Sequence, residues 1–294
     1  TLRINLILSE SLYGILYEEE KEMKETSASV LMTVYNDGGR LLEESILSVI
    51  KQKRYYDQFV IVNDGSSDSS KQIIEKYLKD YTNKIEFIDR EENIGRAYSL
   101  NEGLNACKGE LVFINDADDF SEENRFKKTI EYYDKHKKNK KIAVIGGKGI
   151  ISDGKTKNKY YRFFIMRNGI IPKSQVYYGM PFIHSSCAYV REKLVFVGGF
   201  PTEISSCIDY FTIIKLSALF NIIGLNEYLV VRNKDGKNFF TQKKIENQYN
   251  KNLSLIDEWK RKNYPNSKMY EFLKVTMKNI WKIVKGNRHN EKFK

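Results

Sequence analysis

The sequence has little cysteine and little proline. Its 294 residues contain only three cysteines, Cys107, Cys187 and Cys207, and four prolines. An odd number of widely spaced cysteines does not suit the disulfide framework of a small secreted protein, so we expect a reducing, cytoplasmic compartment. The scarcity of proline excludes long proline-rich linkers.

Long apolar runs are also missing. Residues 213–225 form an apolar run that contains Lys215, and it is shorter than the roughly 20 residues that a membrane-spanning helix needs. Residues 4–8 are too few for the core of a signal peptide and precede an acidic stretch. The first residue is Thr rather than Met, so the sequence leaves open what precedes it.

The composition predicts a folded domain with a basic surface. Apolar residues make up 41% and aromatic residues 13%, which argues against disorder and is enough for one sizeable core with a helical appendage. The net charge of +11 suits a nucleic acid, an anionic membrane or a phosphate-bearing substrate. No zinc-finger spacing and no repeated Arg/aromatic pattern occurs, so we do not expect nucleic acid as a partner.

Short apolar segments alternate with segments of helical period in the first half of the chain. This alternation predicts a mostly parallel sheet with helices on both faces, which binds ligands at the carboxyl ends of its strands. The predicted strands are 28–36, 58–68, 84–90 and 110–116, and the predicted helices are 41–52, 70–81 and 97–107. Further along, the periodicity predicts helices over 122–136 and 211–220 and strands over 142–146 and 227–233.

Three carboxylates follow the predicted strand 110–116: Asp116, Asp118 and Asp119. If the strand continued, Asp116 and Asp118 would point to the same face and repel each other unless a cation joined them. Mg²⁺ or Mn²⁺ commonly uses one or two carboxylates together with substrate phosphates. The alternative is a solvated acidic turn in which Asp119 or Ser121 caps the next helix.

Four ordered motifs resemble the family 2 inverting glycosyltransferases, which have the GT-A fold and use nucleotide-diphospho-sugars. "VLMTVYNDGGRLLEESILSVIKQ" is similar to the opening strand, loop and helix of that family. "FVIVNDGSSDSS" resembles its V-D-D-G-S-x-D turn, with Asn63 in place of the first Asp. "NIGRAYSLNEGLNACKGELVFINDADD" and "VGGFPTEISSCIDYFTIIKLS" resemble two later segments, so the resemblance covers residues 28 to about 233.

The resemblance implies a donor site for a nucleotide-sugar, UDP-linked by the habit of the family. Asp64 would accept a hydrogen bond from the base, or alternatively hold its own turn. Arg96 would neutralise phosphate or contact the base, or alternatively lie on the surface at a helix start. Asp118 would bind Mn²⁺ or Mg²⁺ directly, and Asp116 would meet the metal or the ribose. The implied nucleotide-sugar-binding residues are Thr33, Tyr35, Asn36, Asp64, Gly95, Arg96, Asp116 and Ala117.

The resemblance also implies that Asp209 is the general base, which deprotonates the acceptor hydroxyl during an inverting displacement. The alternative role for Asp209 is the N-cap of the helix 211–220. The chain departs from the family pattern in Ile208, which replaces a Glu, and in Lys234, which stands where the family often has a metal-proximal His. Either Asp235 or water would complete the metal coordination, or Lys234 would contact phosphate directly. Residues 234–241 suit a mobile lid over donor and acceptor.

Two further features have a structural and a functional interpretation. His184 is the one histidine inside the expected core, and we expect a structural role for it. The aromatic segment 160–182 suits either an acceptor groove or core filling.

The organisation that follows is an N-terminal arm (1–26), a GT-A domain (27–242) and a basic helical C-terminal extension (243–294). The GT-A domain divides into a nucleotide-binding half, 27–120, and an acceptor half, 121–242. The extension is either a packing helix or an amphipathic element that binds the inner face of a membrane. The expected acceptor is a glycan or a lipid-linked glycan, and the oligomeric state is left open.

Two other functions compete with the transferase. A sugar-nucleotidyltransferase needs an extended Gly-rich phosphate loop, which Gly38-Gly39-Arg40 matches only in part. A carbohydrate-binding protein with an inactive GT-A fold would explain Asn63, Ile208 and the missing histidine.

Overall fold

We describe the fold from a computed structural model, which covers residues 26–53, 56–81, 83–152, 157–160, 168–233 and 243–275. The predictions for the arm before Thr26, for Lys234 and the loop 234–241, and for the chain beyond Val275 lie outside these residues.

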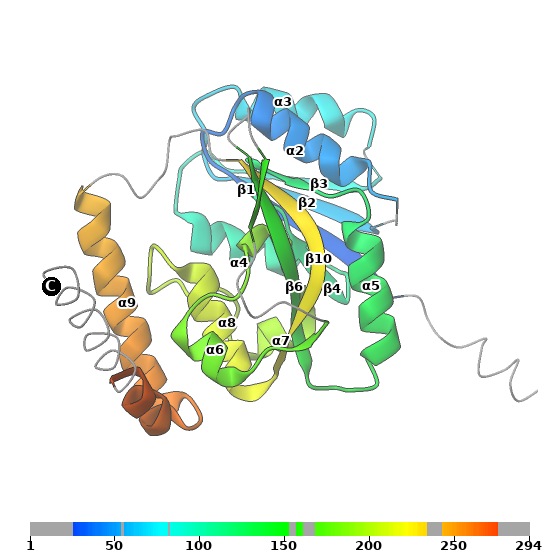
Figure 1. Cartoon of the computed structure of the whole chain (residues 1–294). Coiled ribbons are helices and arrows are strands. Elements are labelled where there is room, and N and C mark those ends of the chain that lie inside the picture. Colours follow the sequence, from blue (N-terminus) through cyan, green and yellow to red (C-terminus); the bar gives the residue numbers. More distant parts are fainter. Residues whose placement is uncertain are drawn as a thin grey trace, which may run out of the picture.

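Helices and strands alternate along the chain (Figure 1). In order they are β1 (Ala28–Val34), α2 (Arg40–Ile50), β2 (Gln58–Asn63), α3 (Ser70–Leu78), β3 (Ile85–Asp89), α4 (Arg96–Ala106), β4 (Leu111–Ile114), β5 (Asp119–Ser121), α5 (Arg125–His136) and β6 (Ile142–Ser152). The second half has β7 (Lys157–Tyr160), β8 (Gly169–Ile170), α6 (Lys173–Tyr178), the 3-10 turn η1 (His184–Ser186), β9 (Ala188–Val190), α7 (Arg191–Phe196), α8 (Ile208–Leu219), β10 (Asn221–Asn233) and α9 (Lys243–Asn263). Residues 267–275 are also helical.

The strands of the described residues form one mixed sheet in the order β3-β2-β1-β4-β9-β6-β10-β5, with β7 beside β6 and β8 beside β10. Strands β1 to β4 are mutually parallel, and β10 is parallel to β6. Strand β9 runs antiparallel to both of its neighbours, β4 and β6. The predicted parallel order of the first four strands is thus confirmed, whereas the second half adds antiparallel strands that the periodicity did not predict.

Both faces of the sheet are buried, as the continuous apolar character of its strands requires. In β2, Val60 and Val62 face the core under α4 and α8, while Phe59 and Ile61 face the core under α2 and α5. The helices therefore form one layer on each side of the sheet (Figure 1).

Several predicted bounds change in the structure. Strand β4 ends at Ile114, so Asp116 and Asp118 lie in a turn, and the argument from strand alternation does not apply to them. Helix α5 begins at Arg125 with Asn124 as its N-cap residue and no side-chain cap, so the predicted capping by Asp119 or Ser121 is wrong. Strand β10 begins at Asn221, and irregular pairing near Tyr228 lets it follow the sheet across a longer span.

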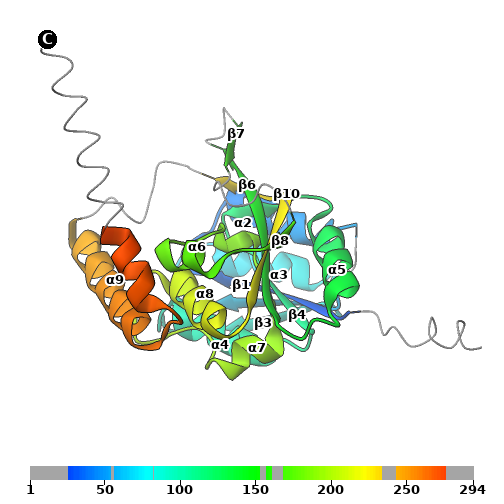
Figure 2. The same cartoon turned by 60° about the horizontal axis from the view of Figure 1, so that its bottom comes forward.

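Helix α9 lies beside α6 and α8, on the outside of one helical layer (Figure 2). Its Ile256 is fully buried in the same core as Phe211 and Ile214 of α8. The part of the C-terminal extension that the structure describes is thus a packing element of the domain.

Candidate active site

Three loops that carry polar residues meet at one edge of the sheet. They follow β1, β2 and β4, whose carboxyl ends lie together because these strands are parallel. The backbone N–H of Asn36 donates to Ser66 Oγ at 3.0 Å, and that of Ser67 donates to Asn36 Oδ1 at 2.8 Å. The structure therefore brings together the loops in which the sequence places most of the donor site.

Asp64, in the loop after β2, is buried and holds the start of helix α4. Its carboxylate accepts hydrogen bonds from Arg90 Nη1 at 2.9 Å and from the backbone N–H groups of Ile94 and Gly95 at 3.1 and 3.0 Å. Gly95 has φ of 102°, a conformation that suits glycine because other residues are strained there. Asp64 thus has a structural role in the described structure, and its predicted contact to a nucleotide base stays a prediction.

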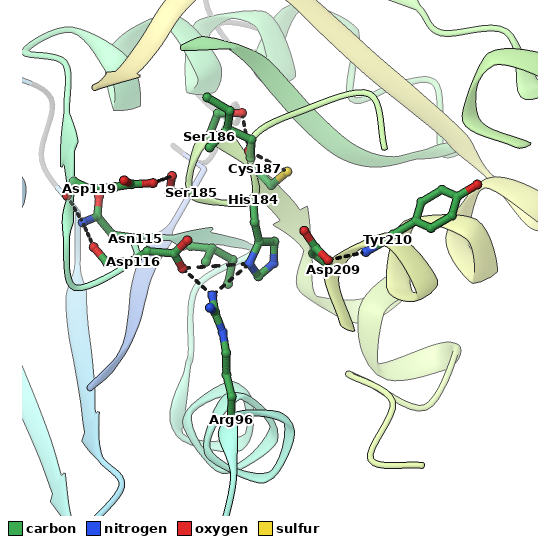
Figure 3. A network of polar contacts seen from close by, with 12 residues as sticks. Arg96, Asn115, Asp116, Asp119, His184, Ser185, Ser186, Cys187, Asp209 and Tyr210 are labelled. Atoms are coloured by element: carbon green, nitrogen blue, oxygen red, sulfur yellow. Dashed lines mark hydrogen bonds and ion pairs between the residues drawn. The ribbon is translucent and has the colours of Figure 1, made fainter. Parts of the chain in front are cut away.

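Arg96, the first residue of α4, forms the centre of a polar cluster (Figure 3). Its Nη2 donates to Asp116 Oδ1 at 2.5 Å and approaches His184 Nδ1 at 3.4 Å. Burial alone would raise the pKa of Asp116, but the charge of Arg96, with His184, lowers it below its ordinary value. Asp116 is therefore ionised and paired with Arg96 in this structure.

His184 belongs to this cluster, which sequence reasoning did not foresee. Its buried side chain lies beside Arg96 of α4, and its ring packs against Tyr189 and Phe200. This burial lowers the pKa of His184. Its position between Asp116 and Asp209 gives it a place in the site rather than in the apolar core (Figure 3). The polar pair Ser185-Ser186 after it, inside an otherwise apolar stretch, was the available signal.

The turn after β4 carries more negative charge than Arg96 balances. Desolvation, together with the charges of Asp116 and Asp37, raises the pKa of Asp118 to about 6. Desolvation also raises the pKa of Asp37, which lies in the loop after β1 and to which the sequence had assigned no role in the site. A cation near Asp118 and Asp116 would relieve this repulsion, so these two carboxylates fit a divalent metal ion.

These carboxylates do not build a metal site by themselves. In the part of the chain that the structure describes, no three His, Cys, Asp or Glu side chains are grouped so as to hold a metal ion. The fit is therefore to a cation that shares its coordination with a ligand such as a diphosphate, which is how Mg²⁺ is commonly bound.

Asp119 has a role different from its neighbours. It is buried in β5, accepts a hydrogen bond from Ser185 Oγ, and has a pKa raised well above the ordinary value by burial and by Asp116. Its carbonyl oxygen, like that of Asp116, accepts a hydrogen bond from Ser45 Oγ of α2. Asp119 thus fixes the acidic turn to η1 and α2.

A buried arginine holds the backbone beside the acidic turn. Arg125 is fully buried and donates to the carbonyl oxygens of Ile114 and Cys187 at 2.7 and 3.2 Å. It also donates to Asn115 Oδ1 and Ser121 Oγ, and burial lowers its pKa to about 10. One guanidinium therefore joins the end of β4 to the segment that carries His184.

Asp209 is the second residue of α8, whose N-cap residue is Cys207, so the alternative of Asp209 as N-cap is wrong. Its Oδ1 accepts a hydrogen bond from the N–H of Tyr210 at 2.8 Å. The charge of Asp116 first, and then that of Asp209, raises the pKa of Arg96. The structure thus places Asp209 in the electrostatic field of the cluster, with His184 between it and Asp116 (Figure 3).

The remaining predicted site residues lie at the same edge. Thr33 is half-buried near the end of β1, Tyr35 is 50% exposed in the following loop, and Ala117 is buried in the acidic turn. Of the aromatic segment 160–182, Tyr177 and Phe182 are buried core residues, which favours core filling at these two positions.

Comparison with known proteins gives the family. The model of "Glycosyl transferase family 2" matches residues 29–196. Over 187 residues the chain is 28% identical to the UDP-Gal:alpha-D-GlcNAc-diphosphoundecaprenol beta-1,3-galactosyltransferase of Escherichia coli, covering 60% of this chain and 62% of that protein. It is 33% identical over 116 residues to an uncharacterized glycosyltransferase of Methanocaldococcus jannaschii, MJ1057, covering 40% of each.

Solved structures agree on the architecture. TarS of S. aureus, residues 1–349 in complex with UDP, superposes with a TM-score of 0.66 at 19% identity, covering 83% of this chain and 68% of that one. The mannosyltransferase PcManGT of Pyrobaculum calidifontis, in complex with GDP-Man and Mn²⁺, gives a TM-score of 0.62 at 17% identity, covering 83% and 67%. At these identities the likeness shows the fold, and it confirms the predicted GT-A class.

The chain belongs to glycosyl transferase family 2, as its motifs indicated. It spans less than two thirds of the length of the two curated relatives named above.

Removing the buried guanidinium should destabilise the domain. We expect Arg125→Met to lower the free energy of unfolding by about 2–4 kcal/mol, because buried carbonyl oxygens lose their donors. Urea denaturation measures this change. The control is Lys127→Met on the same helix, where Lys127 is exposed and only 3.9 Å from Glu131, and its effect should stay within about 0.5 kcal/mol. Equal stability of the two variants would contradict the supporting role of Arg125.

Proposed function

We propose that this protein is an inverting glycosyltransferase that moves a sugar from a UDP-linked donor to a glycan or lipid-linked glycan acceptor. The observation that carries the proposal is the Arg96–Asp116–His184 cluster, which lies at the carboxyl edge of the sheet between the acidic turn and Asp209. Family membership supports the reaction class. The relatives and structures whose names mention UDP-Gal, UDP and UDP-GlcNAc support a UDP-linked donor.

Each charged group has a proposed task in the transfer. Arg96 binds the diphosphate of the donor, for which a planar guanidinium is well suited. Asp116 and Asp118 would hold Mn²⁺ or Mg²⁺, which would neutralise charge on the diphosphate. The proposed nucleotide contacts are those expected from the sequence, with Asp64 and Thr33 nearest the base.

Asp209 is the proposed base. The oxygen of the acceptor hydroxyl forms a bond to the anomeric carbon, the bond from that carbon to the diphosphate oxygen breaks, and the hydroxyl proton goes to the Asp209 carboxylate. A carboxylate opposite the leaving group makes this a single displacement, which inverts the anomeric configuration.

Donor binding should depend on a divalent cation through Asp118. We expect UDP to raise the melting temperature of the wild-type protein only when Mn²⁺ or Mg²⁺ is present. In Asp118→Asn, Mn²⁺ should not increase the shift in melting temperature that UDP causes, because the carboxylate that would bind the cation is gone. Differential scanning fluorimetry with UDP, with and without Mn²⁺, measures this. Asp80→Asn, which lies just after α3, serves as control. An unchanged response to Mn²⁺ in Asp118→Asn would refute the metal assignment.

Loss of the base should separate binding from chemistry. Asp209→Asn should bind UDP as the wild type does, but release UDP from the donor about 10²–10⁴-fold more slowly, since that is the usual contribution of a positioned base. The assay is UDP release from a panel of UDP-sugars with Mn²⁺, with water as acceptor. A wild-type rate in Asp209→Asn would show that the base is elsewhere.

If the wild-type protein binds glycans but releases UDP from no donor, an inactive carbohydrate-binding protein is the better description. Consumption of a nucleoside triphosphate with a sugar 1-phosphate would indicate a nucleotidyltransferase.

We also propose that the protein works at the inner face of a membrane, as a peripheral enzyme. No helix within the described residues is long and apolar enough to cross a bilayer. Residues 243–294 hold fourteen Lys and Arg against five Asp and Glu, so most of the net charge of +11 lies there. Met269 and Leu273 are 51% and 40% exposed on the helical segment 267–275, next to Lys268 and Lys274. Exposed apolar side chains among lysines suit an anionic lipid surface.

Vesicle binding tests the membrane proposal. The protein should pellet with phosphatidylcholine vesicles that contain phosphatidylglycerol, and less with phosphatidylcholine alone or at high salt, because the attraction is partly electrostatic. Met269→Ser with Leu273→Ser should weaken the binding, whereas Ile170→Ser, an exposed apolar residue of β8, should not. Pelleting that is independent of anionic lipid would contradict the proposal.

A further inference from the structure

Helix α9 lies outside the segment that the family model matches, yet it contacts both sides of the proposed base. Asp209 follows Ser206 and Cys207 and precedes Tyr210. Side chains of α9 reach Ser206 on one side of Asp209 and Tyr210 on the other, from Asn252 and Lys260 (Figure 2 shows α9 beside α8).

On the N-terminal side, α9 holds a backbone turn that is unfavourable by itself. Asn252 is almost fully buried, and its Nδ2 donates to Ser206 Oγ at 2.8 Å. Cys207 has φ of 60° and ψ of 24°, a left-handed conformation that residues other than glycine rarely adopt. Such a strained residue persists only when the surrounding structure holds it, and it lies two positions before Asp209.

On the C-terminal side, a buried lysine fixes the residue after Asp209. Lys260 is 4% exposed, and its Nζ donates to the carbonyl oxygen of Tyr177 at 3.0 Å and lies 3.4 Å from the hydroxyl oxygen of Tyr210. The Tyr210 hydroxyl donates to the same carbonyl at 2.7 Å. Lys260 also pairs with Asp257 at 2.6 Å and lies over the rings of Tyr177 and Tyr210.

Burying a lysine between two helices is unfavourable, because its ammonium group loses hydration. Burial lowers the pKa of Lys260, because an ammonium loses its hydration there, and the Asp257 carboxylate only partly offsets this. An apolar side chain of similar length would pack α9 against α8 at least as well. The directional contacts to Tyr210 and to the Tyr177 carbonyl are what an apolar side chain could not supply.

We infer that α9 is a positioning element of the active site: through Asn252 and Lys260 it fixes the first turn of α8 and thereby the direction of the Asp209 carboxylate. This inference rests on the proposed function, since it takes Asp209 as the base. Neither Asn252 nor Lys260 touches the reacting atoms, so both act through the residues beside Asp209. The C-terminal extension thus contributes to catalysis and is more than a surface-binding appendage.

The test removes the directional contacts and keeps the packing. In Lys260→Met, the rate constant kcat for UDP release from the donor, with water as acceptor, should fall about 10- to 100-fold, the usual effect of removing an outer positioning contact. The donor KM and the Kd for UDP should stay within about twofold of the wild-type values, because the nucleotide site lies on the other half of the sheet. Tyr210→Phe, which removes one hydroxyl, should give a smaller fall in the same direction. Lys262→Met, on an exposed position of α9 that pairs with Glu258, is the matched control and should leave kcat unchanged.

A double-mutant cycle separates positioning of the base from general loosening of the domain. If Lys260 acts through Asp209, Lys260→Met should have no further effect in an Asp209→Asn background. Additive losses in the double variant, or a wild-type kcat in both Lys260→Met and Tyr210→Phe, would overturn the inference and leave the proposed function standing. A wild-type rate in Asp209→Asn alone would overturn both. Excess Mn²⁺ should not restore the rate of Lys260→Met. A restored rate would assign the loss to a weakened metal site and overturn the inference.

Discussion

The site depends on how negative charge is balanced at the carboxyl edge of the sheet. The charges of Asp37, Asp116, Asp118 and Asp209 interact with the guanidinium of Arg96, and Arg232 adds a second positive charge near Asp116. Arg96 pairs directly with Asp116 and keeps it ionised, while the carboxyl groups of Asp37 and Asp118 keep raised pKa values. An anionic diphosphate could enter such a corner only with added positive charge, which a bound cation would supply.

This charge arrangement needs rigid support, and the support is polar. Arg125, Asn115 and Ser45 join the acidic turn to the end of β4 and to helix α2 through buried hydrogen bonds. Networks of this kind are costly when incomplete and hold one geometry when they are satisfied. The carboxylates that follow the apolar strand β4 are therefore tolerated, because buried hydrogen bonds hold their backbone while their side chains remain accessible to ligands.

The sequence predicted the first half of the fold well because its signals are local. Between residues 28 and 116, alternating strands and helices have the right number, order and approximate bounds, since each is marked by its own periodicity. Strands β5 and β9 were missed because three residues carry no usable period, and their place in the sheet depends on partners far away in the chain. The start of α8 was misplaced because its N-cap residue is a cysteine in a left-handed conformation rather than Ser, Thr, Asn or Asp.

The candidate site was predictable where residues follow strands of the same sheet. Asp64, Arg96, Asp116 and Asp118 were all singled out, and their loops meet at one edge. Arg125 and Lys260 were not, and His184 was expected to be structural, because a single histidine, arginine or lysine does not itself indicate what it meets in space. Their contacts join segments 62 to 88 positions apart, which only the tertiary structure specifies.

The pairing of β9 between β4 and β6 limits how this enzyme can move. Because β9 is hydrogen-bonded to both strands, the half that carries the acidic turn and the half that carries Asp209 are built on one uninterrupted sheet. Bending the two halves about a hinge would break a row of backbone hydrogen bonds. Entry and departure of ligands must therefore be accommodated by loops and side chains above the sheet, and the fold itself sets the distance between the acidic turn and Asp209.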